Sequence, residues 1–333
     1  MRRPLSVRAV LAGLTAVLIA ACSSAKPAPT EPSPTTPPAS TSTPSASATP
    51  APAPPPAPEP PRPPQVAIIP AQVQQGDMAV LRLDKPVDGE VKVKAQGLDE
   101  QPKVYRLGAR PVAFIGVPAT ARTGSYPVTV TWPGGEWTGN LEVIYKKFTE
   151  DRLVVTEQQE ATYYDPRQAD EWARLFERRS HSIDRPLWDG AFQEPLAGPL
   201  RVTTYFGEIR YVNGKETGRH SGMDFGADEG TPVYAPAVGK VVLAEKLIVT
   251  GNTITLDHGL NLYTTYYHLS AIDVQVGDWV EPGQVIGKVG NTGFSTGAHL
   301  HWTATIGNTP VDPWPLTQEP PLGFRQSGPV TPE

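Results

Sequence analysis

A proline-rich segment between Lys26 and Gln65 sets the first limit on what this chain can fold into. Seventeen of its forty residues are proline, and most of the others are alanine, serine or threonine. Such a composition cannot bury a core, and each proline removes a backbone hydrogen-bond donor. We therefore expect residues 22–65 to form an extended, disordered tether, and compact structure to begin near residue 66.

The first 21 residues have the features of an export signal. Three arginines precede an apolar run that ends at residue 21 and is too short to span a bilayer. Cys22 follows directly and is the only cysteine of the 333 residues, so no internal disulfide can form. The segment resembles a bacterial lipoprotein signal, with Cys22 as the lipidation site; the alternative is an ordinary secretory signal cleaved after Ala21. The lipoprotein interpretation predicts a protein of the cell envelope, lipid-anchored to a membrane and facing the periplasm or cell wall.

The charge of the chain argues against one class of partner. The formal net charge is −5, with 29 basic and 34 acidic residues. A nucleic-acid-binding protein needs a basic patch to neutralise phosphates, and no such excess is present. We therefore expect no nucleic acid among the partners.

Residues 66–148 have the pattern of a small β-sandwich. Segments such as "AVLRLD", "VAFIGV" and "SYPVTVTW" alternate with turn signals such as "QQGD", "ARTG" and "PGGE". Strands at this spacing favour an antiparallel, immunoglobulin-like accessory domain. The segment contains no histidine and no cluster of catalytic residue types. It is predicted to position the rest of the chain or to bind an interaction partner; a simple spacer fits equally well.

A helical connector is expected at residues 149–186. Asp165 is predicted to cap a helix that has Pro166 at its first position. Trp172 and Phe176 belong to an apolar stripe at helical spacing. His181 follows this helix and is predicted to lie on the surface.

The remainder, residues 187–320, has β character throughout and is followed by a C-terminal tail at 321–333. Two segments, "EGTPVYAPAVGKVV" and "VGDWVEPGQVIGKVG", share one rhythm, from a glycine through a small loop to "GKV". This echo suits a barrel-sandwich-like domain built from related halves. The chain as a whole is therefore predicted to be mainly β, with one connecting helix.

The histidines are concentrated in one part of the chain. Six occur, and five of them lie between residues 220 and 301. Successive residues of a strand point to opposite faces, so His299 and His301 in "HLHW" face the same way. His220 and Asp224 share a face if their segment is extended. These four groups can converge on one cation, and imidazole and carboxylate are ligands that suit zinc.

The number of these groups exceeds what a catalytic zinc needs. Such a site keeps three protein ligands and leaves the fourth position to water. With His268, five groups are available, which is one or two too many for direct coordination. The surplus histidines are candidates for proton transfer and charge stabilisation beside the metal.

Four motifs give residues 187–316 a resemblance to a known family. In chain order they are "WDGAFQEPLAGPLRVTTYFGEIRYVNG", "RHSGMDF", "YYHLS" and "GNTGFSTGAHLHW". They resemble the lysostaphin/LytM-type zinc endopeptidases, which cut peptidoglycan peptides. The region upstream is similar to lipoprotein members of that family. The resemblance implies a LytM-type catalytic domain, one Zn²⁺ per chain, and stem or cross-bridge peptides of peptidoglycan as substrate.

The resemblance also implies a role for each position. His220, Asp224 and His301 would bind zinc, and His268 and His299 would form the catalytic pair. His299 is favoured as the base and His268 as the donor to an oxyanion, although the reverse assignment fits the sequence too. One position departs from the family: an acidic residue often follows the HxH motif, whereas this chain reads "HWTATIG". A supporting contact is therefore in doubt.

Two other functions fit parts of the pattern. A catalytically silent LytM-like domain would bind peptidoglycan or regulate a partner cell-wall hydrolase, but the ligand set here is complete. A biotinyl- or lipoyl-type carrier shares the barrel-sandwich rhythm, but no lysine stands at a hairpin tip with methionine neighbours. The sequence therefore predicts a tethered zinc metalloendopeptidase, a peptidoglycan hydrolase.

Overall fold

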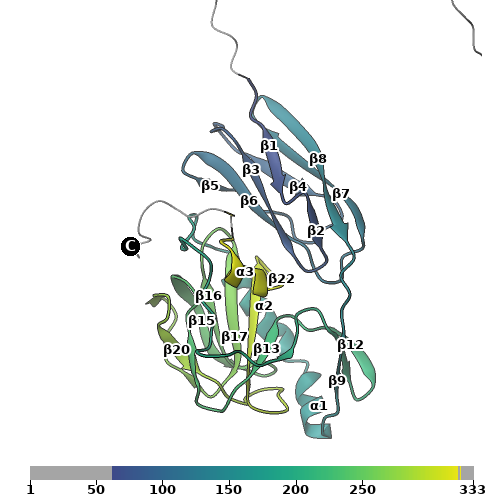
Figure 1. Ribbon diagram of the computed structural model, residues 1–333, viewed down its shortest axis with the longest axis vertical. Helices are drawn as coiled ribbons and strands as arrows, with labels where there is room; N and C mark the ends of the chain where they lie inside the picture. The colour runs from purple at the N-terminus through teal and green to yellow at the C-terminus, as the bar shows by residue number, and fades with distance from the viewer. Residues whose placement is uncertain (1–61, 322, 324–333) are drawn as a thin grey trace, which may run out of the picture. The chain divides into compact units, whose positions relative to one another are not determined.

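The computed structural model describes residues 62–321 and 323, all within one compact unit, Pro60–Glu333 (Figure 1). The predicted signal peptide, Cys22, most of the tether and most of the C-terminal tail lie outside the described residues. Within the described part, no helix is long and apolar enough to cross a membrane. The boundaries proposed above at residues 66, 149, 187 and 321 remain predictions.

Residues 66–144 form two four-stranded sheets around one hydrophobic core. One sheet has the order β1 (Val66–Ile69), β3 (Met78–Leu83), β6 (Arg110–Gly116), β5 (Tyr105–Leu107). The other has the order β2 (Gln72–Gln74), β8 (Gly135–Ile144), β7 (Gly124–Trp132), β4 (Lys92–Ala95). Leu81 and Ile115 of the first sheet and Val128 and Leu141 of the second are buried in the shared core. This is the sandwich that the alternating strands predict.

The connector contains one strand and two helices. β9 (Glu150–Leu153) is followed by α1 (Glu157–Tyr163) and α2 (Gln168–Arg178). The helix expected from the apolar stripe is α2, but Asp165 does not cap it. The Asp165 carboxylate instead accepts bonds from Arg167 in the turn before the helix, and no side chain caps α2. α1 begins with a capping box in which Thr156 and Gln159 satisfy each other's backbone N–H groups.

A large twisted sheet of eight strands forms the centre of the C-terminal part. Its order is β10 (Val202–Thr204), β13 (Met223–Gly226), β21 (His299–Ile306), β17 (Leu262–Leu269), β16 (Gly251–Asp257), β15 (Gly239–Leu247), β19 (Trp279–Val280), with β22 (Thr309–Val311) paired to β21. A smaller sheet has the order β14 (Pro232–Tyr234), β20 (Val285–Lys288), β18 (Ala271–Ile272). Side chains from both sheets, including Phe225, Ile254, Leu300, Val233 and Ile286, share a core. The pairings of the described strands give two separate sheets rather than a closed barrel.

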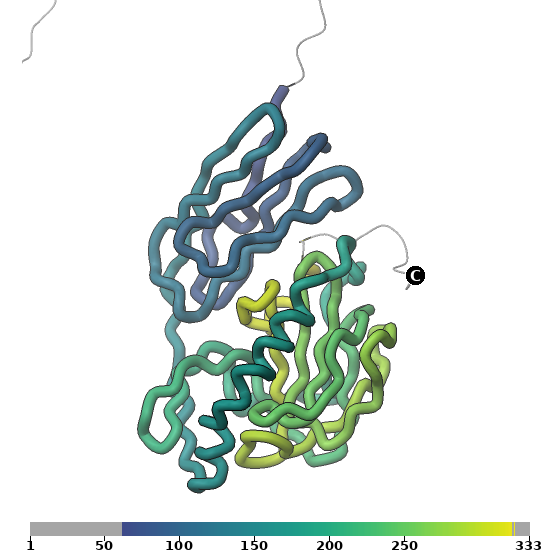
Figure 2. Tube along the Cα trace, turned by 180° about the vertical axis from the view of Figure 1, so that it is seen from behind, coloured from purple at the N-terminus to yellow at the C-terminus, as the bar shows by residue number. Residues whose placement is uncertain are grey.

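The remaining elements cover the other face and one edge of the large sheet. β11 (Ile209–Val212) pairs with β12 (Lys215–Arg219) and, in parallel, with β9 from the connector. Figure 2 shows α2 lying across the strands of the large sheet, and Leu175 of α2 packs on Leu243 and Leu247 of β15. The short helix α3 (Trp314–Gln318) follows β22. The chain is thus mainly β, as the sequence predicts.

Strand β21 shows how the large sheet separates two environments. Leu300 and Trp302 point into the apolar core between the sheets. The alternate residues His299, His301, Thr303 and Thr305 must then point to the opposite face. That face is therefore polar yet largely buried, so its side chains need hydrogen-bond or metal partners.

Candidate metal centre

Two neighbouring strands bring Asp224 and His301 together. β13 and β21 are antiparallel, and Asp224 is the direct cross-strand partner of His301. Side chains opposite each other in such a pair lie on the same face and within contact distance. Oδ1 of Asp224 lies 2.7 Å from Nδ1 of His301.

His220 reaches the same point from the end of β12. Its backbone is tied to the neighbouring turn, because its N–H donates to Glu208 and its carbonyl accepts from Gly207. Nε2 of His220 lies 3.0 Å from Oδ1 of Asp224 and 2.9 Å from Nδ1 of His301. The three residues between His220 and Asp224 therefore fold back far enough for both side chains to meet.

Gly222 allows this close return of the chain. A Cβ at this position would overlap the backbone carbonyl of Trp302 and lie 2.8 Å from Nε2 of His301. Any larger residue would push β13 away from β21. The glycine in "RHSGMDF" is thus a steric requirement of the centre.

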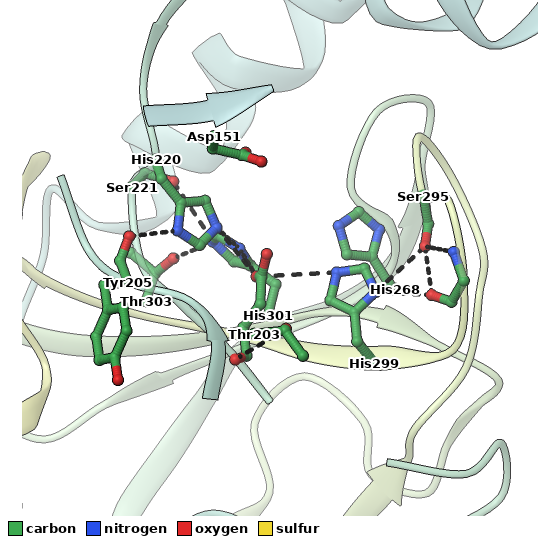
Figure 3. A network of polar contacts seen from close by, with 12 residues as sticks. Asp151, Thr203, Tyr205, His220, Ser221, His268, Ser295, His299, His301 and Thr303 are labelled. Atoms are coloured by element: carbon green, nitrogen blue, oxygen red, sulfur yellow. Dashed lines mark hydrogen bonds and ion pairs between the residues drawn. The ribbon is translucent and has the colours of Figure 1, made fainter. Parts of the chain in front are cut away.

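The outer hydrogen bonds orient both imidazoles. Nδ1 of His220 donates to the carbonyl of Tyr205 at 2.9 Å, so the neutral ring turns an Nε2 lone pair inward (Figure 3). Nε2 of His301 lies 2.8 Å from the hydroxyl of Thr303, which can accept its proton and leave Nδ1 free. Such outer partners select the tautomer of metal-binding histidines. Thr303 stands where the family pattern led us to doubt a supporting contact.

The resulting donor set fits a zinc ion. Three lone pairs, on His220, Asp224 and His301, meet within 3.0 Å of one another, and a cation between them removes their mutual repulsion. Two imidazoles and one carboxylate are a usual ligand set of catalytic zinc, which also keeps one open position. At metal–ligand distances of roughly 2.0–2.2 Å, tetrahedral ligand atoms lie about 3.3 Å apart, so only a small outward shift is needed.

The protonation states suit metal binding. Burial would raise the pKa of the Asp224 carboxyl, but the neighbouring His220 and His301 outweigh this and hold the pKa well below its usual range. Burial lowers the pKa of His301 to about 4, although Asp224 opposes the shift. At neutral pH the centre therefore offers an ionised carboxylate and a neutral His301, the forms that bind metals.

His299 lies beside the three donors without joining them. Its Nε2 is 3.8 Å from Oδ1 of Asp224, and its Nδ1 lies 2.8 Å from the carbonyl of Gly297. Since the carbonyl can only accept, Nδ1 carries the proton and Nε2 presents its lone pair toward the centre. Ser295, which lies 3.3 Å from Nδ1, further orients the ring (Figure 3).

His268 reaches the centre through an unusual backbone conformation. Its neighbour Tyr267 is the cross-strand partner of His301, so strict alternation would send His268 into the apolar core. His268 instead has φ +62, and its ring lies 4.8 Å from that of His299. Left-handed φ at a non-glycine residue costs about 1–3 kcal/mol and clusters at functional sites. Burial, with smaller contributions from His299 and His301, lowers the pKa of His268 to about 3, so the ring is neutral.

The other two histidines take no part in the centre. His181 is exposed after α2, as expected. His258 is fully buried, where Nδ1 donates to the carbonyl of Val238 at 2.8 Å and Nε2 lies 2.7 Å from the hydroxyl of Thr264. It ties strands together, which agrees with a scaffold role.

Three contributors to the centre were missed from the sequence. Tyr267 stacks on His301 with ring centroids 4.9 Å apart and planes at 19°. Arg210 lies 4.0 Å from Oδ2 of Asp224 and is paired at 2.8 Å with Asp151 of the connector. No local pattern signals the pair of Asp151 and Arg210, because its members lie 59 positions apart in the sequence.

A cleft gives access to the centre. It has a volume of about 270 Å³ and is lined by Asp224, His268, His299 and His301 together with polar residues of the loop 294–298. An ionised carboxylate, converging imidazole nitrogens and an open side are the arrangement of a metallohydrolase-type centre, here built on a β-sheet.

Comparison with known proteins identifies the family of this part of the chain. Residues 218–313 match the model of peptidase family M23, and the chain accordingly contains a peptidase M23 domain. It is 33% identical over 182 residues to the peptidoglycan DD-endopeptidase ShyA of Vibrio cholerae, covering 54% of this chain and 39% of ShyA. It is 38% identical over 133 residues to lysostaphin of Staphylococcus simulans, covering 38% of this chain and 27% of lysostaphin.

The fold is also found in a solved structure from Pseudomonas aeruginosa, provisionally described as a peptidase M23. The two are 29% identical with a TM-score of 0.55, and the match covers 73% of this chain and 94% of that one. By contrast, the chain spans well under two thirds of the length of ShyA and lysostaphin.

Proposed function

We propose that this protein is a zinc-dependent endopeptidase that hydrolyses peptide bonds in the stem peptides or cross-bridges of peptidoglycan. The observation that carries the proposal is the meeting of three inward donor atoms, on His220, Asp224 and His301, with two further histidines, His268 and His299, at their side. The peptidase M23 domain and the similarity to the peptidoglycan DD-endopeptidase ShyA and to lysostaphin support the reaction class.

The ligand residues would hold one Zn²⁺ per chain. When bound, zinc acidifies water to a pKa of about 7 and polarises a carbonyl oxygen. A single carboxylate among the ligands leaves the centre with net positive charge, which favours an anionic nucleophile and an oxyanion. The role of this chain is to hold the ligand geometry from β13 and β21, two adjacent strands of a rigid sheet.

His299 and His268 would handle protons and developing charge. Nε2 of His299 has a free lone pair facing the centre and is placed to take a proton from water. His268 holds its proton on Nδ1, which donates to the carbonyl of Thr292 at 2.8 Å, so its Nε2 also carries a lone pair. To donate to an oxyanion, the neutral ring of His268 would have to carry its proton on Nε2 instead, which gives up the bond from Nδ1 to Thr292.

The proposed setting is the cell envelope. The tether and the lipoprotein-like signal ending at Cys22 support attachment to a membrane, with the catalytic domain reaching the cell wall. Peptidoglycan peptides would be the substrate, and the sandwich of residues 66–144 is available to bind an interaction partner.

Digestion of purified peptidoglycan by the full chain tests the proposal. New amino groups should appear only with zinc bound, and mass spectrometry of the fragments identifies the bond that is cut. A zinc-loaded protein that binds peptidoglycans of several cross-link types but releases no amino groups from any of them would instead be the silent regulator.

A further inference from the structure

A second cavity adjoins the metal centre on the same face of the large sheet. It has a volume of about 540 Å³, and His268 and His301 line both this cavity and the cleft described above. Thr303 and Thr305 of β21 contribute to its floor, and Trp172 of α2 to its wall. We call it the arginine cavity, after its three lining arginines, Arg179, Arg210 and Arg219.

The lining of the arginine cavity carries positive charge and contains no acidic residue. Its lining includes three guanidinium groups and no Asp or Glu residue. Arg210 is paired with Asp151, which is outside the lining. Among the described residues, no carboxylate lies within 4.0 Å of Arg179, and the nearest to Arg219 is Glu216, at 4.0 Å from Nη1.

Arg179 is the strongest sign of a binding site. The residue is only 3% exposed, yet its guanidinium makes a single hydrogen bond, from Nη2 to the hydroxyl of Thr265 at 2.7 Å. Its Nε has no partner. An arginine cannot lose its proton in a protein, and burying an unpaired charge costs several kcal/mol. The fold therefore maintains this charge against an energetic cost.

Most of the buried side-chain polar atoms that lack a hydrogen-bond partner belong to residues that line this cavity. The described residues have seven buried side-chain nitrogen or oxygen atoms without a hydrogen-bond partner. Five of the seven belong to residues of this lining: Arg179 Nε, Arg219 Nε, Arg219 Nη1, Thr305 Oγ1 and Asn308 Oδ1. Three of these five are guanidinium donors, which suit a planar anion that accepts two parallel bonds.

The strand register gives the separation from the metal centre. Thr265, the partner of Arg179, pairs with Thr303, while Tyr267 pairs with His301. The two cross-strand pairs are two residues apart, or about 7 Å along the sheet. An extended peptide advances about 3.3 Å per residue, so the cavity lies one or two substrate residues from the bond to be cut.

We propose that the arginine cavity binds a free carboxylate of the substrate peptide, one or two residues beyond the bond that is hydrolysed. The inference rests on the proposed peptidase function and narrows its substrate class to peptides with an unblocked terminal carboxylate near that bond. Arg179 and Arg219 bind the carboxylate, and the Trp172 ring contacts the apolar side chain beside it. An amidated peptide leaves both guanidinium groups unsatisfied and is selected against.

The kinetic test uses two synthetic stem peptides that differ only in a carboxylate or a carboxamide at the end beyond the cut bond. A hydrogen bond to a charged group contributes about 1.5–3 kcal/mol, so the parent should prefer the carboxylate roughly 10- to 100-fold, mainly in KM. Arg179→Met should abolish the preference with kcat little changed, and Arg179→Lys should restore part of it. Arg178→Met is the matched control, because Arg178 is exposed, adjacent in sequence and outside the cavity. Equal cleavage of both peptides by the parent would overturn the proposal.

Two further measurements separate this proposal from the peptidase function and from a structural role. Calorimetry with the same peptide pair should show binding of the carboxylate form to the parent and not to Arg179→Met, even if neither peptide is cleaved.

Arg179→Met should unfold at the parent's temperature or above it, because it removes an unpaired buried charge. A lower unfolding temperature would indicate a structural arginine and contradict us. A second outcome would also contradict the proposal. If acetate and inorganic phosphate bind with the same affinity whether or not the carboxylate peptide is present, the cavity is a site for free anions.

Discussion

The hydroxyl of Thr303 lies 2.8 Å from Nε2 of His301, on the side of the ring that faces away from the metal centre. Both residues point to the same face of β21, so the strand itself sets the contact. In this chain a neutral hydroxyl therefore orients His301, in a segment, "HWTATIG", that contains no acidic residue.

The first prediction concerns this contact. Thr303→Val keeps the shape of the side chain but removes the acceptor that holds the His301 proton on Nε2. Loss of such an outer partner typically weakens metal binding 10- to 100-fold, which we expect in a chelator competition titration. Thr305→Val is the matched control, since its buried hydroxyl has no partner. Equal zinc affinities of parent and Thr303→Val would exclude the orienting role.

The second prediction concerns Gly222. Gly222→Ala places a Cβ against the carbonyl of Trp302 and next to His301, and neither can move without parting β13 from β21. We expect zinc content per chain to fall by more than half and the unfolding temperature to drop, measured by elemental analysis and thermal scanning. Gly190→Ala, where a Cβ meets nothing within 4 Å, should match the parent in both measurements. A fully zinc-loaded Gly222→Ala protein would contradict the steric argument.

Local patterns predicted those parts of the site that depend on one strand. Alternation in "HLHWTATIG" placed His299 and His301 on one face, and β21 has that arrangement. The pairing of Asp224 with His301 joins residues 77 positions apart, which a local pattern does not encode. His268 shows the limit most clearly: alternation alone assigns it to the core, and only its left-handed φ returns it to the site.

The connector shows a similar division. The apolar stripe correctly located α2, but the predicted Asp165 cap was wrong because that carboxylate pairs with Arg167. α1 was missed, although "TEQQ" at residues 156–159 has the spacing of a capping box and was a readable signal. The contact of Asp151 with Arg210 depends on parallel pairing of β9 with β11, which sequence periodicity does not reveal.

The third prediction is a pH dependence of stability that arises from His258. Burial lowers the pKa of His258 from 6.5 to about 4, despite its bond to the carbonyl of Val238. Between these values the unfolded chain binds a proton that the folded chain does not, so the free energy of unfolding falls as the pH falls. The contribution is fully present above pH 6.5 and its loss, about 3 kcal/mol, is complete below pH 4.

Denaturant titrations of parent and His258→Gln across pH 4 to 7 check this dependence. The free energy of unfolding of the parent should fall more steeply with falling pH than that of His258→Gln. This holds whatever the difference between the two free energies at pH 7. The residues of the metal centre are identical in both proteins, so their contribution to the pH dependence of stability cancels when the two curves are compared. Parallel curves would show that His258 is not kept neutral by the fold.

The fourth prediction concerns the proposed anchor. Cys22→Ala removes the thiol that lipidation requires, so the protein should move from the membrane fraction to the soluble fraction of the envelope or the medium. Cell fractionation with immunoblotting measures the shift, and Ser23→Ala serves as the neighbouring control. If Cys22→Ala remains with the membranes, the anchor is another part of the chain or a binding partner.

The last prediction separates the roles of two histidines on one strand face. His301 contributes Nδ1 to the three converging lone pairs, whereas Nε2 of His299 stands 3.8 Å from the Asp224 carboxylate. His301→Ala should therefore lose zinc and activity together. His299→Ala should keep its zinc but lose roughly 10²–10⁴-fold in kcat, the usual contribution of a positioned acid–base group. Zinc content and peptide-cleavage rate must be measured on the same preparations of both variants and the parent. If His299→Ala loses its zinc while His301→Ala retains it, the ligand assignment is reversed; if His299→Ala turns over like the parent, the proton is handled by His268.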